Sequence, residues 1–383
     1  MEGISFVTIK EKLPLYKGEE EALRIEVIHF NENGFQVVAQ KGLYKIGDKA
    51  LYIQPDYCVP DNEYFKEFVR PGGEISKSYL GKIAGVPSRI RAKKFNFSVV
   101  KNGQSVYSNG ILLPLNVVKE WFGNKAQDLE YLKEQLGVYK YVEPEETTLN
   151  NYNRPFPSGV YKTDENNFNN ISHEIIFPCT LYGTEKIDGS SITLGVINGE
   201  LIICSRNLQK EIYIKKLVGK RSKTLLEKLF FWKKHDLDVY ETVENDDIFV
   251  KEGMKILRAV KEFNPNINNF LLRGELNGGS CKGSGNKYNP SSKLPTNIKL
   301  FGLDLYVGGI AVRESQENFF NFCCTYGLDT VKLVFCKEFK SSSDVIGECN
   351  RYFIENMIEG IVIRDEYNTI SAKVMNQEYD SKK

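Results

Sequence analysis

Short runs of apolar residues, several of them alternating with polar residues, fill the first 115 positions of the chain. They are FVTI (6–9), ALRIEVIHF (22–30), FQVVA (35–39), ALYIQ (50–54) and GILLPL (110–115). Turn-forming pairs such as Asn33-Gly34, Gly47-Asp48 and Asn102-Gly103 separate them. Runs of this kind predict short strands, and a series of them predicts a small barrel. We therefore expect an OB-like β-barrel domain over residues 1–147.

The pattern changes in the middle of the chain. Apolar positions recur with helical spacing from Val117 to Leu136, and residues 143–158 are polar and proline-containing without a period. After Ile175, strand-like runs alternate with helical segments near residues 251–263 and 315–326. We expect a linker at 148–165 and a second domain at 166–383 with antiparallel sheets, so that the whole chain is of the α+β class.

Composition agrees with two compact domains and indicates where in the cell the protein is found. The chain has 383 residues, more than one average domain needs, and 41% of them are hydrophobic. Eight scattered cysteines without a CxxC pair, and only three histidines, favour reduced thiols over disulfides or a zinc site. The chain opens without an apolar leader and has no apolar run that would span a bilayer. We therefore expect an intracellular protein without a membrane partner.

Net charge alone does not point to a nucleic-acid partner, because 51 Lys and Arg residues nearly balance 50 Asp and Glu residues. A local basic stretch lies at residues 82–97, KIAGVPSRIRAKKFNF. Such a stretch can bind phosphates with its cations and stack bases on its phenylalanines. A solvated surface loop can have the same composition, and both interpretations stay open.

Candidate chemistry begins with the segment TEKIDGSS (residues 184–191), placed where one strand should turn into the next. A lysine that is partly desolvated beside a bound cation can lose its proton and attack phosphorus, which makes Lys186 a candidate nucleophile. Asp188 would share a face of the extended chain with Lys186, and Gly189 would let the backbone approach a ligand. Alone, this short pattern is also what a surface turn would contain.

Five further segments follow in order along apolar runs. They are SRN (205–207), RGEL (273–276), FGLD (301–304), EGIVIR (359–364) and KVMN (373–376). Together with the lysine segment they resemble the nucleotidyltransferase motifs of the covalent ligase and capping-enzyme superfamily, over residues 182–379. Six motifs in this order are hard to obtain by chance, although each alone has a structural explanation, such as a buried glutamate paired with a core arginine.

The resemblance implies a nucleotidyltransferase (adenylyltransferase) domain that uses ATP. Its catalytic residues would be Lys186, which forms lysyl-AMP and expels pyrophosphate, Asp188, and Lys373, which grips the α-phosphate. Phe301 would stack on one face of the adenine while Val362 packs on the other. The residues that the resemblance implies for ATP binding are Glu185, Lys186, Arg206, Glu275, Phe301, Glu359, Val362 and Lys373.

The resemblance also implies a divalent cation, Mg²⁺ or Mn²⁺. Asp188, Glu275 and Glu359 would hold the hydrated ion through water. The ion would neutralise phosphate charge and keep Lys186 unprotonated. Arg206 would bind the ribose or the phosphates with its forked donors.

One position departs from the family pattern. Ligases that resemble this sequence usually carry two lysines spaced by one residue in the last motif, and the second place is Met375 here. Another cation, such as Lys287 or Lys382, could reach the phosphate, the first step could be slow, or the register could be wrong. A glycine-rich segment at 278–288 could close over phosphates or be a plain surface loop.

Domain order selects among members of the superfamily. DNA ligases and capping enzymes that resemble this pattern have an OB domain after the last motif, and the common RNA ligases add a helical domain there. A smaller, Naegleria-type group of RNA ligases has its OB domain first, and this layout is similar to theirs. The resemblance thus implies an ATP-dependent RNA ligase that acts as a monomer in RNA repair. It would join RNA 5′-phosphate and 3′-hydroxyl ends, either at a nick or as free strands. A DNA nick ligase, an mRNA guanylyltransferase and a catalytically silent RNA-binding protein with the same fold are the alternatives.

Overall fold

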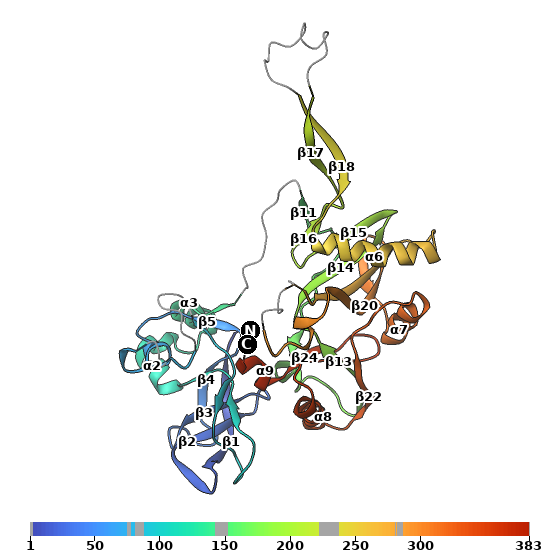
Figure 1. The fold of residues 1–383 in the computed structure, drawn as a ribbon. Helices are drawn as coiled ribbons and strands as arrows, with labels where there is room; N and C mark the ends of the chain where they lie inside the picture. Colours follow the sequence, from blue (N-terminus) through green and yellow to red (C-terminus); the bar gives the residue numbers. More distant parts are fainter. Residues whose placement is uncertain are drawn as a thin grey trace.

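The computed structural model describes residues 3–74, 78–80, 88–141, 152–221, 237–279, 281 and 286–382. Figure 1 shows two groups of sheets, one from the N-terminal part of the chain and one from the part after residue 152. The long hairpin of β17 (Tyr213–Arg221) and β18 (Leu237–Glu244) projects away from the second group. The two ends of the chain lie near each other, between the two groups.

The N-terminal group is built around one long, bent strand, β1 (Ile4–Lys17). Its first half pairs with β4 and its second half with β2, in a five-stranded antiparallel sheet of order β3-β2-β1-β4-β9. The pairing shifts register between Ile9 and Glu11 and between Pro14 and Tyr16, and such irregularities bend a strand. The bounds are Glu20–Phe30 for β2, Gln36–Gln40 for β3, Lys49–Ile53 for β4 and Ile111–Pro114 for β9.

Smaller elements complete the N-terminal group. A three-stranded sheet has the order β10-β5-β6, and β7 pairs with β8. Short helices pack beside them on a shared core that includes Ile4, Leu51 and Val118. The bounds are Tyr57–Val59 (β5), Lys66–Val69 (α1), Ser88–Arg89 (β6), Lys93–Phe95 (β7), Val106–Ser108 (β8), Leu115–Phe122 (α2), Leu129–Leu136 (α3) and Tyr139–Lys140 (β10).

Two large sheets make up the second group. A seven-stranded sheet has the order β11-β16-β15-β14-β19-β20-β21, and a five-stranded sheet has the order β12-β24-β23-β13-β22. The pairings are antiparallel, with β12 parallel to β24, so the predicted α+β class with antiparallel sheets is confirmed. The bounds are Asn153–Pro155 (β11), Asn166–Asn167 (β12), Cys179–Lys186 (β13), Ser190–Ile197 (β14), Glu200–Cys204 (β15), Leu208–Lys210 (β16), Phe270–Asn277 (β19), Asn297–Val307 (β20), Ile310–Arg313 (β21), Leu333–Phe339 (β22), Gly360–Arg364 (β23) and Ser371–Met375 (β24).

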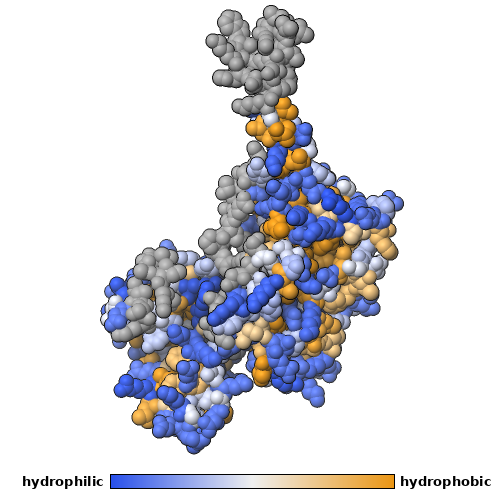
Figure 2. Space-filling view, in the orientation of Figure 1, coloured by the Kyte–Doolittle hydropathy of each residue, from blue (hydrophilic) through white to orange (hydrophobic). Residues whose placement is uncertain are grey.

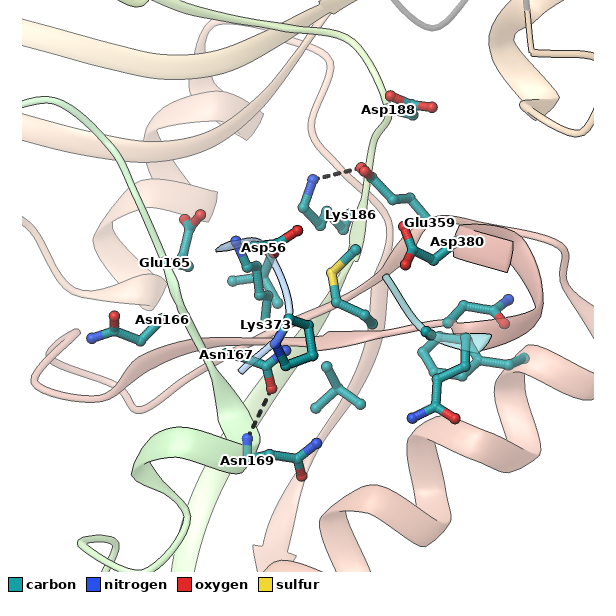
Figure 3. A pocket seen from close by; sticks show the side chains of 18 of the residues that line it. Asp56, Glu165, Asn166, Asn167, Asn169, Lys186, Asp188, Glu359, Lys373 and Asp380 are labelled. Carbon is teal, nitrogen blue, oxygen red and sulfur yellow. Dashed lines mark hydrogen bonds and ion pairs between the residues drawn. The ribbon is translucent and has the colours of Figure 1, made fainter. Parts of the chain in front are cut away.

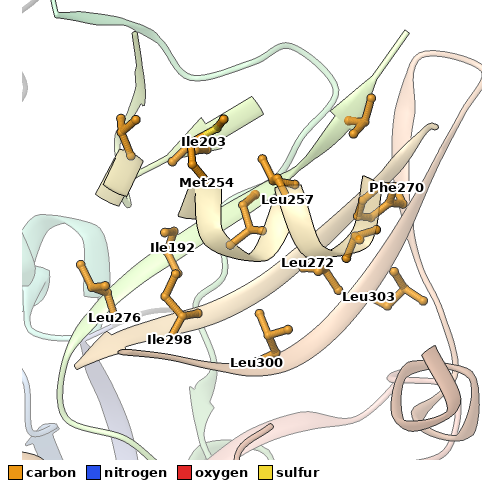
Figure 4. Close-up of a cluster of buried hydrophobic side chains, with 14 of the residues drawn as sticks. Ile192, Ile203, Met254, Leu257, Phe270, Leu272, Leu276, Ile298, Leu300 and Leu303 are labelled. Atoms are coloured by element: carbon orange, nitrogen blue, oxygen red, sulfur yellow. The ribbon is translucent and has the colours of Figure 1, made fainter. Parts of the chain in front are cut away.

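Helix α6 (Ile248–Phe263) covers one face of the seven-stranded sheet. It begins at Asp247, whose side chain accepts a 2.8 Å hydrogen bond from the backbone N–H of Phe249. Met254 and Leu257 are buried against apolar side chains of the sheet (Figure 4), and burying such a side chain stabilises a fold by about 1.5–3 kcal/mol. The other helices of this group are α4 (Phe168–Ile171), α7 (Gln316–Thr325), α8 (Ser342–Glu355) and α9 (Gln377–Lys382).

Part of the predicted linker belongs to the second group. Residues 153–155 form the edge strand β11, which pairs with β16, and the side chain of Val160 is buried. The backbone oxygen of Tyr161 accepts a 2.8 Å hydrogen bond from the buried Arg273. These residues therefore pack against the seven-stranded sheet, while positions 148–151 of the predicted linker lie outside the described residues.

The surface is mostly hydrophilic in the view of Figure 2. An apolar patch lies on the β17–β18 hairpin, where Leu217 and Val218 are about half exposed. This hairpin includes part of the segment 225–247, for which the sequence offers no functional explanation; residues 225–236 of that segment lie outside the described ranges. Among those ranges, no helix is both long and apolar enough to cross a membrane.

Candidate active site

A cavity of about 1360 Å³ lies between the two groups of sheets. Its walls come from the N-terminal group, for example Asp56, Arg89 and Lys94, and from strands of both large sheets. Figure 3 shows a close view of the side chains that line it. All the residues that the sequence predicts for catalysis and nucleotide binding line this one cavity: Glu185, Lys186, Asp188, Arg206, Glu275, Phe301, Glu359, Val362 and Lys373.

Lys186 is the last residue of β13, the strand between β22 and β23. The register of β13 and β23 places Lys186 opposite Gly360, so that Glu359 lies beside the amine. The Nζ atom donates a hydrogen bond to Glu359 Oε2 at 2.5 Å (Figure 3). Position 360 requires glycine because a Cβ there would lie 2.5 Å from the backbone oxygen of Val374. The strand pairing thus fixes the position of the candidate nucleophile.

Two opposing effects act on the pKa of Lys186. Burial lowers the pKa, since a charged amine loses its hydration. The carboxylates of Glu359, Glu275 and Glu165 together raise it by more, so that the pKa lies above its ordinary value. The amine is therefore protonated at neutral pH, and a protonated amine has no lone pair with which to attack phosphorus. Positive charge brought against these carboxylates would favour loss of the proton.

Asp188 lies in the tight connection between β13 and β14 and is only 5% exposed. Its backbone oxygen accepts a 2.9 Å hydrogen bond from the side chain of Asn289, and its carboxylate accepts one of 2.8 Å from the hydroxyl of Tyr379. Glycine follows at position 189 because a Cβ there would lie 2.4 Å from the backbone oxygen of Leu276. Local structure therefore dictates the conformation of this motif.

Phe301 and Val362 provide apolar surface on the cavity wall. Phe301 is in β20 and Val362 is in β23, so they come from different sheets. The guanidinium of the buried Arg364 lies 5.4 Å from the centre of the Phe301 ring and donates a 2.7 Å hydrogen bond to Glu165. An aromatic ring and a valine that reach one cavity from two sheets suit a flat heterocycle.

The other residues predicted to bind the nucleotide lie elsewhere on the cavity wall. Arg206 is in the turn after β15, and Glu275 of β19 lies opposite Ser191 of β14. Glu185, next to the lysine, accepts a 2.5 Å hydrogen bond from the hydroxyl of Tyr352. Helix α8, which the sequence did not predict, therefore orients the Glu185 carboxylate.

Carboxylates suited to a divalent cation line the cavity. Hard cations such as Mg²⁺ and Mn²⁺ prefer oxygen ligands, and Asp188, Glu275 and Glu359 supply them. In the described part of the chain, no three His, Cys, Asp or Glu side chains stand close enough together to hold a metal ion directly. These carboxylate oxygens are of the donor type that divalent cations and their water ligands take.

Lys373 and Met375 lie two residues apart on β24 and therefore share one face of the strand. Both line the cavity. The sequence offers Lys287 and Lys382 as replacements for the second lysine of the family. Lys287 has its Nζ 4.9 Å from the ring centre of Tyr288, and the side chain of Lys382 lies outside the described part. Other lysines that line the cavity are Lys94, Lys140 and Lys210.

Several cavity residues were not predicted from sequence as parts of the site. Arg89, which pairs with Asp56 at 2.5 Å, and Glu165 line the cavity from outside the six motifs, and Tyr379, behind the wall, donates a hydrogen bond to Asp188. The basic stretch 82–97 was the one signal for Arg89, and its residues 82–87 lie outside the described ranges. Of the glycine-rich segment 278–288, positions 280 and 282–285 are also outside those ranges.

A comparison with protein-family models matches residues 180–377 to the RNA ligase family. The chain belongs to the RNA ligase family. The match runs from β13 to the first residue of α9 and includes all six motifs of this ligase, so the predicted family is confirmed. A search of curated proteins gives no match.

Solved structures have the same fold over nearly the whole length of this ligase. Two mutant forms of Naegleria gruberi RNA ligase, one with AMP and Mn and one with ATP and Mn, each give a TM-score of 0.69 at 19% identity, covering 100% of this chain and 99% of the other. The same RNA ligase with PPi gives a TM-score of 0.65 at 19% identity, covering 99% and 98%. The likeness of fold extends to the N-terminal part, which the family model does not cover.

Proposed function

We propose that this RNA ligase uses ATP to join RNA ends through lysyl-AMP and RNA-adenylate intermediates. The observation that carries the proposal is the position of Lys186, at the end of β13 and 2.5 Å from Glu359, in one cavity with residues of the other five motifs. The similar Naegleria gruberi ligase has been solved with ATP, AMP and PPi. These are the substrate and products expected of an ATP-dependent ligase.

Three displacements at phosphorus account for the reaction. First, Lys186 Nζ attacks the α-phosphorus of ATP, a P–N bond forms, the bond to the pyrophosphate oxygen breaks and the amine loses a proton. Second, an oxygen of the RNA 5′-phosphate attacks the same phosphorus, and Lys186 leaves and takes up a proton. Third, the RNA 3′-hydroxyl attacks the 5′-phosphate and loses its proton, a phosphodiester forms, and AMP leaves.

We assign some cavity residues to the adenine of ATP and others to its ribose and phosphates. We assign the two faces of the adenine to Phe301 and Val362, which face the cavity from different sheets. Arg206 suits ribose or phosphate oxygens, because its guanidinium donates in a fork. Lys373 suits the α-phosphate, whose negative charge rises in the transition state.

A divalent cation, Mg²⁺ or Mn²⁺, completes the proposed site. Asp188, Glu275 and Glu359 would hold it through water. When bound, it would neutralise phosphate charge and offset the carboxylates that raise the pKa of Lys186. Manganese is present with AMP and with ATP in the similar solved structures.

The N-terminal part, residues 1–147, is proposed to be an OB-like barrel domain, followed by a linker at 148–165 and a catalytic domain at 166–383. Its strand β1 pairs with both β2 and β4. Two bonds link β3 to the segment around β8: the N–H of Asn109 donates to the Gln36 carbonyl at 2.8 Å, and the N–H of Val38 donates to the Ser108 hydroxyl oxygen at 3.0 Å. These contacts support a sheet that curls towards closure.

RNA is proposed to lie along the cavity on the side of this barrel domain. Arg89, Lys94 and Lys140 of the N-terminal part line the cavity and supply positive charge for phosphates. The ring of Tyr141 lies 4.5 Å from the Arg89 guanidinium and adds an aromatic surface. The substrate would be RNA with a 5′-phosphate and a 3′-hydroxyl, joined by a monomer inside the cell during RNA repair.

Labelled nucleotides test the proposal. The purified protein, given α-labelled ATP and Mg²⁺ or Mn²⁺ without RNA, should carry label after denaturation, and Lys186→Ala should not. Label from GTP instead would indicate a guanylyltransferase. Nicked DNA and RNA substrates, compared side by side, separate a DNA ligase from an RNA ligase. RNA binding without label from either nucleotide would identify a silent RNA-binding protein.

A further inference from the structure

The C-terminal helix α9 lies between the two groups of sheets in Figure 1, and its residues Gln377, Glu378 and Asp380 line the cavity. Asn376, just before the helix, fixes where it begins. Its backbone N–H donates a 2.9 Å hydrogen bond to the carbonyl of Glu359, and its side-chain oxygen accepts one of 3.1 Å from the N–H of Glu378. The start of α9 is therefore tied to the residue that pairs with Lys186.

Tyr379 of α9 contacts Asp188 from outside the cavity lining. Its side chain is fully buried, and its hydroxyl donates a 2.8 Å hydrogen bond to Asp188 Oδ2. The side-chain amide of Asn289 donates a 2.9 Å hydrogen bond to the backbone oxygen of Asp188. The carboxylate and the backbone of Asp188 are thus both held by residues that no motif includes.

The neighbouring residue, Glu378, contacts the N-terminal domain. Its Oε2 accepts a 2.7 Å hydrogen bond from Lys94 Nζ and another from the hydroxyl of Tyr107. Lys94 and Tyr107 lie directly opposite each other on β7 and β8, so their side chains share one face of the strand pair and converge on the glutamate. A second bond between the domains joins the N–H of Gly34 to the carbonyl of Asn169 at 3.1 Å.

We infer that α9 positions both halves of the ligation reaction. Tyr379 orients Asp188 for AMP transfer to Lys186, and Glu378 holds the N-terminal domain beside the cavity for the steps that use RNA. The inference rests on the function proposed above and adds two positioning residues outside the six motifs. The two roles separate in experiment, because each residue contacts a different partner.

Tyr379→Phe tests the first role, because it removes only the hydroxyl. We expect lysyl-AMP formation at saturating ATP to slow about 10-fold, with a higher divalent-cation concentration for half-maximal rate and an unchanged ATP requirement. Tyr44→Phe is the matched control, since the Tyr44 hydroxyl is buried and donates to the Leu112 carbonyl at 3.0 Å, within the N-terminal domain. Equal effects of the two variants, or an unchanged cation requirement in Tyr379→Phe, would overturn this role.

Glu378→Gln tests the second role, because it weakens the contact with Lys94 and leaves the Tyr379–Asp188 bond in place. Enzyme carrying labelled AMP is mixed with RNA that bears a 5′-phosphate. We expect AMP transfer to RNA to slow about 10-fold, because a misplaced reactant reacts more slowly, while lysyl-AMP forms at the wild-type rate. Glu174→Gln is the control, since the Glu174 side chain is mostly exposed. X-ray scattering should also give a larger radius of gyration for Glu378→Ala than for the control.

The outcomes distinguish this inference from the proposed function. If the wild-type protein takes no label from ATP, the proposed function fails. If the wild type takes label and seals RNA while both α9 variants match their controls, the function stands and the positioning roles are wrong. If Glu378→Gln slows lysyl-AMP formation as much as AMP transfer, the second role is wrong as stated.

Discussion

Lys186 Nζ and Glu359 Oε2 lie 2.5 Å apart, although 173 positions separate the two residues in the chain. Strand β13 carries the lysine and the adjacent strand β23 follows the glutamate, so the sheet itself makes the pair. The pair keeps the amine protonated, because the glutamate raises its pKa. Positive charge brought against this carboxylate would favour loss of the proton from Lys186.

Replacing the carboxylate of this pair is expected to impair the first step. Glu359→Gln removes the charge that orients the amine and attracts the cation, so lysyl-AMP formation should fall by roughly 100-fold. The measurement is label from α-labelled ATP on denatured protein over time. Glu348→Gln is the control, because Glu348 makes ion pairs with Lys337 and Arg351 outside the cavity. A rate within threefold of wild type for Glu359→Gln would contradict the assignment.

Met375→Lys is expected to speed the first step. A lysine at this position would share a face of β24 with Lys373 and add a second cation beside the α-phosphate. We expect about a 10-fold gain in the rate of lysyl-AMP formation, as for one added charge contact of about 1.4 kcal/mol. Ile354→Lys is the control, since it adds the same charge at an exposed position of the cavity wall. An equal gain in both variants would point to bulk charge rather than to a specific contact.

Phe301→Ala tests the adenine assignment. Stacking of a base on an aromatic ring contributes about 1–3 kcal/mol, so the ATP concentration for half-maximal labelling should rise by roughly 10- to 100-fold. Phe301→Tyr should keep most of the affinity, because it keeps the ring. Phe263→Ala is the control, since Phe263 is exposed at the end of α6. If the alanine variant changes only the maximal rate, the ring has a different role.

The sequence predicted those parts of the site that the backbone constrains most strongly. Positions 189 and 360 accept only glycine, because a Cβ would lie within 2.5 Å of a backbone oxygen at each. These glycines fix the connection after Lys186 and the start of β23, and both are visible as letters of the motifs. The pairing of β13 with β23 then brings Glu359 to Lys186.

Other parts could not be predicted, because they depend on tertiary packing. Tyr379 meets Asp188 across 191 positions of sequence, and no local pattern marks the pair. Helix α8 buries only Val345 and Cys349, so its apolar stripe is too short to predict a helix. Pro155 lies within the predicted linker, where the polar, proline-containing composition does not predict the short strand β11; a proline is tolerated on such an edge strand.

Asp304, the last residue of the FGLD motif, is expected to support the fold. It is fully buried, accepts a 2.7 Å hydrogen bond from Arg273, and pairs with Arg313. Asp304→Ala would leave buried positive charge without its partner, which costs about 3–5 kcal/mol of the free energy of unfolding. Asp329→Ala breaks an exposed pair with Lys299 and should cost under about 1 kcal/mol. Urea denaturation at pH 7 compares them, and equal midpoints would contradict the prediction.

Buried thiols are expected to make the fold sensitive to alkali. Burial raises the pKa of Cys204, Cys323 and Cys349 to about 12. In the unfolded chain these thiols ionise near pH 8.5, so between about pH 9 and 12 the unfolded state binds fewer protons than the folded state. The free energy of unfolding should therefore fall as pH rises through this window, by up to about 1.4 kcal/mol per pH unit for each thiol.

Urea denaturation from pH 8 to 10.5 tests this expectation. The free energy of unfolding of Cys349→Ala should fall less steeply with pH than that of wild type. Cys336→Ala, which removes an exposed thiol, should give the same slope as wild type. Parallel curves for wild type and Cys349→Ala would mean that this thiol ionises equally in both states.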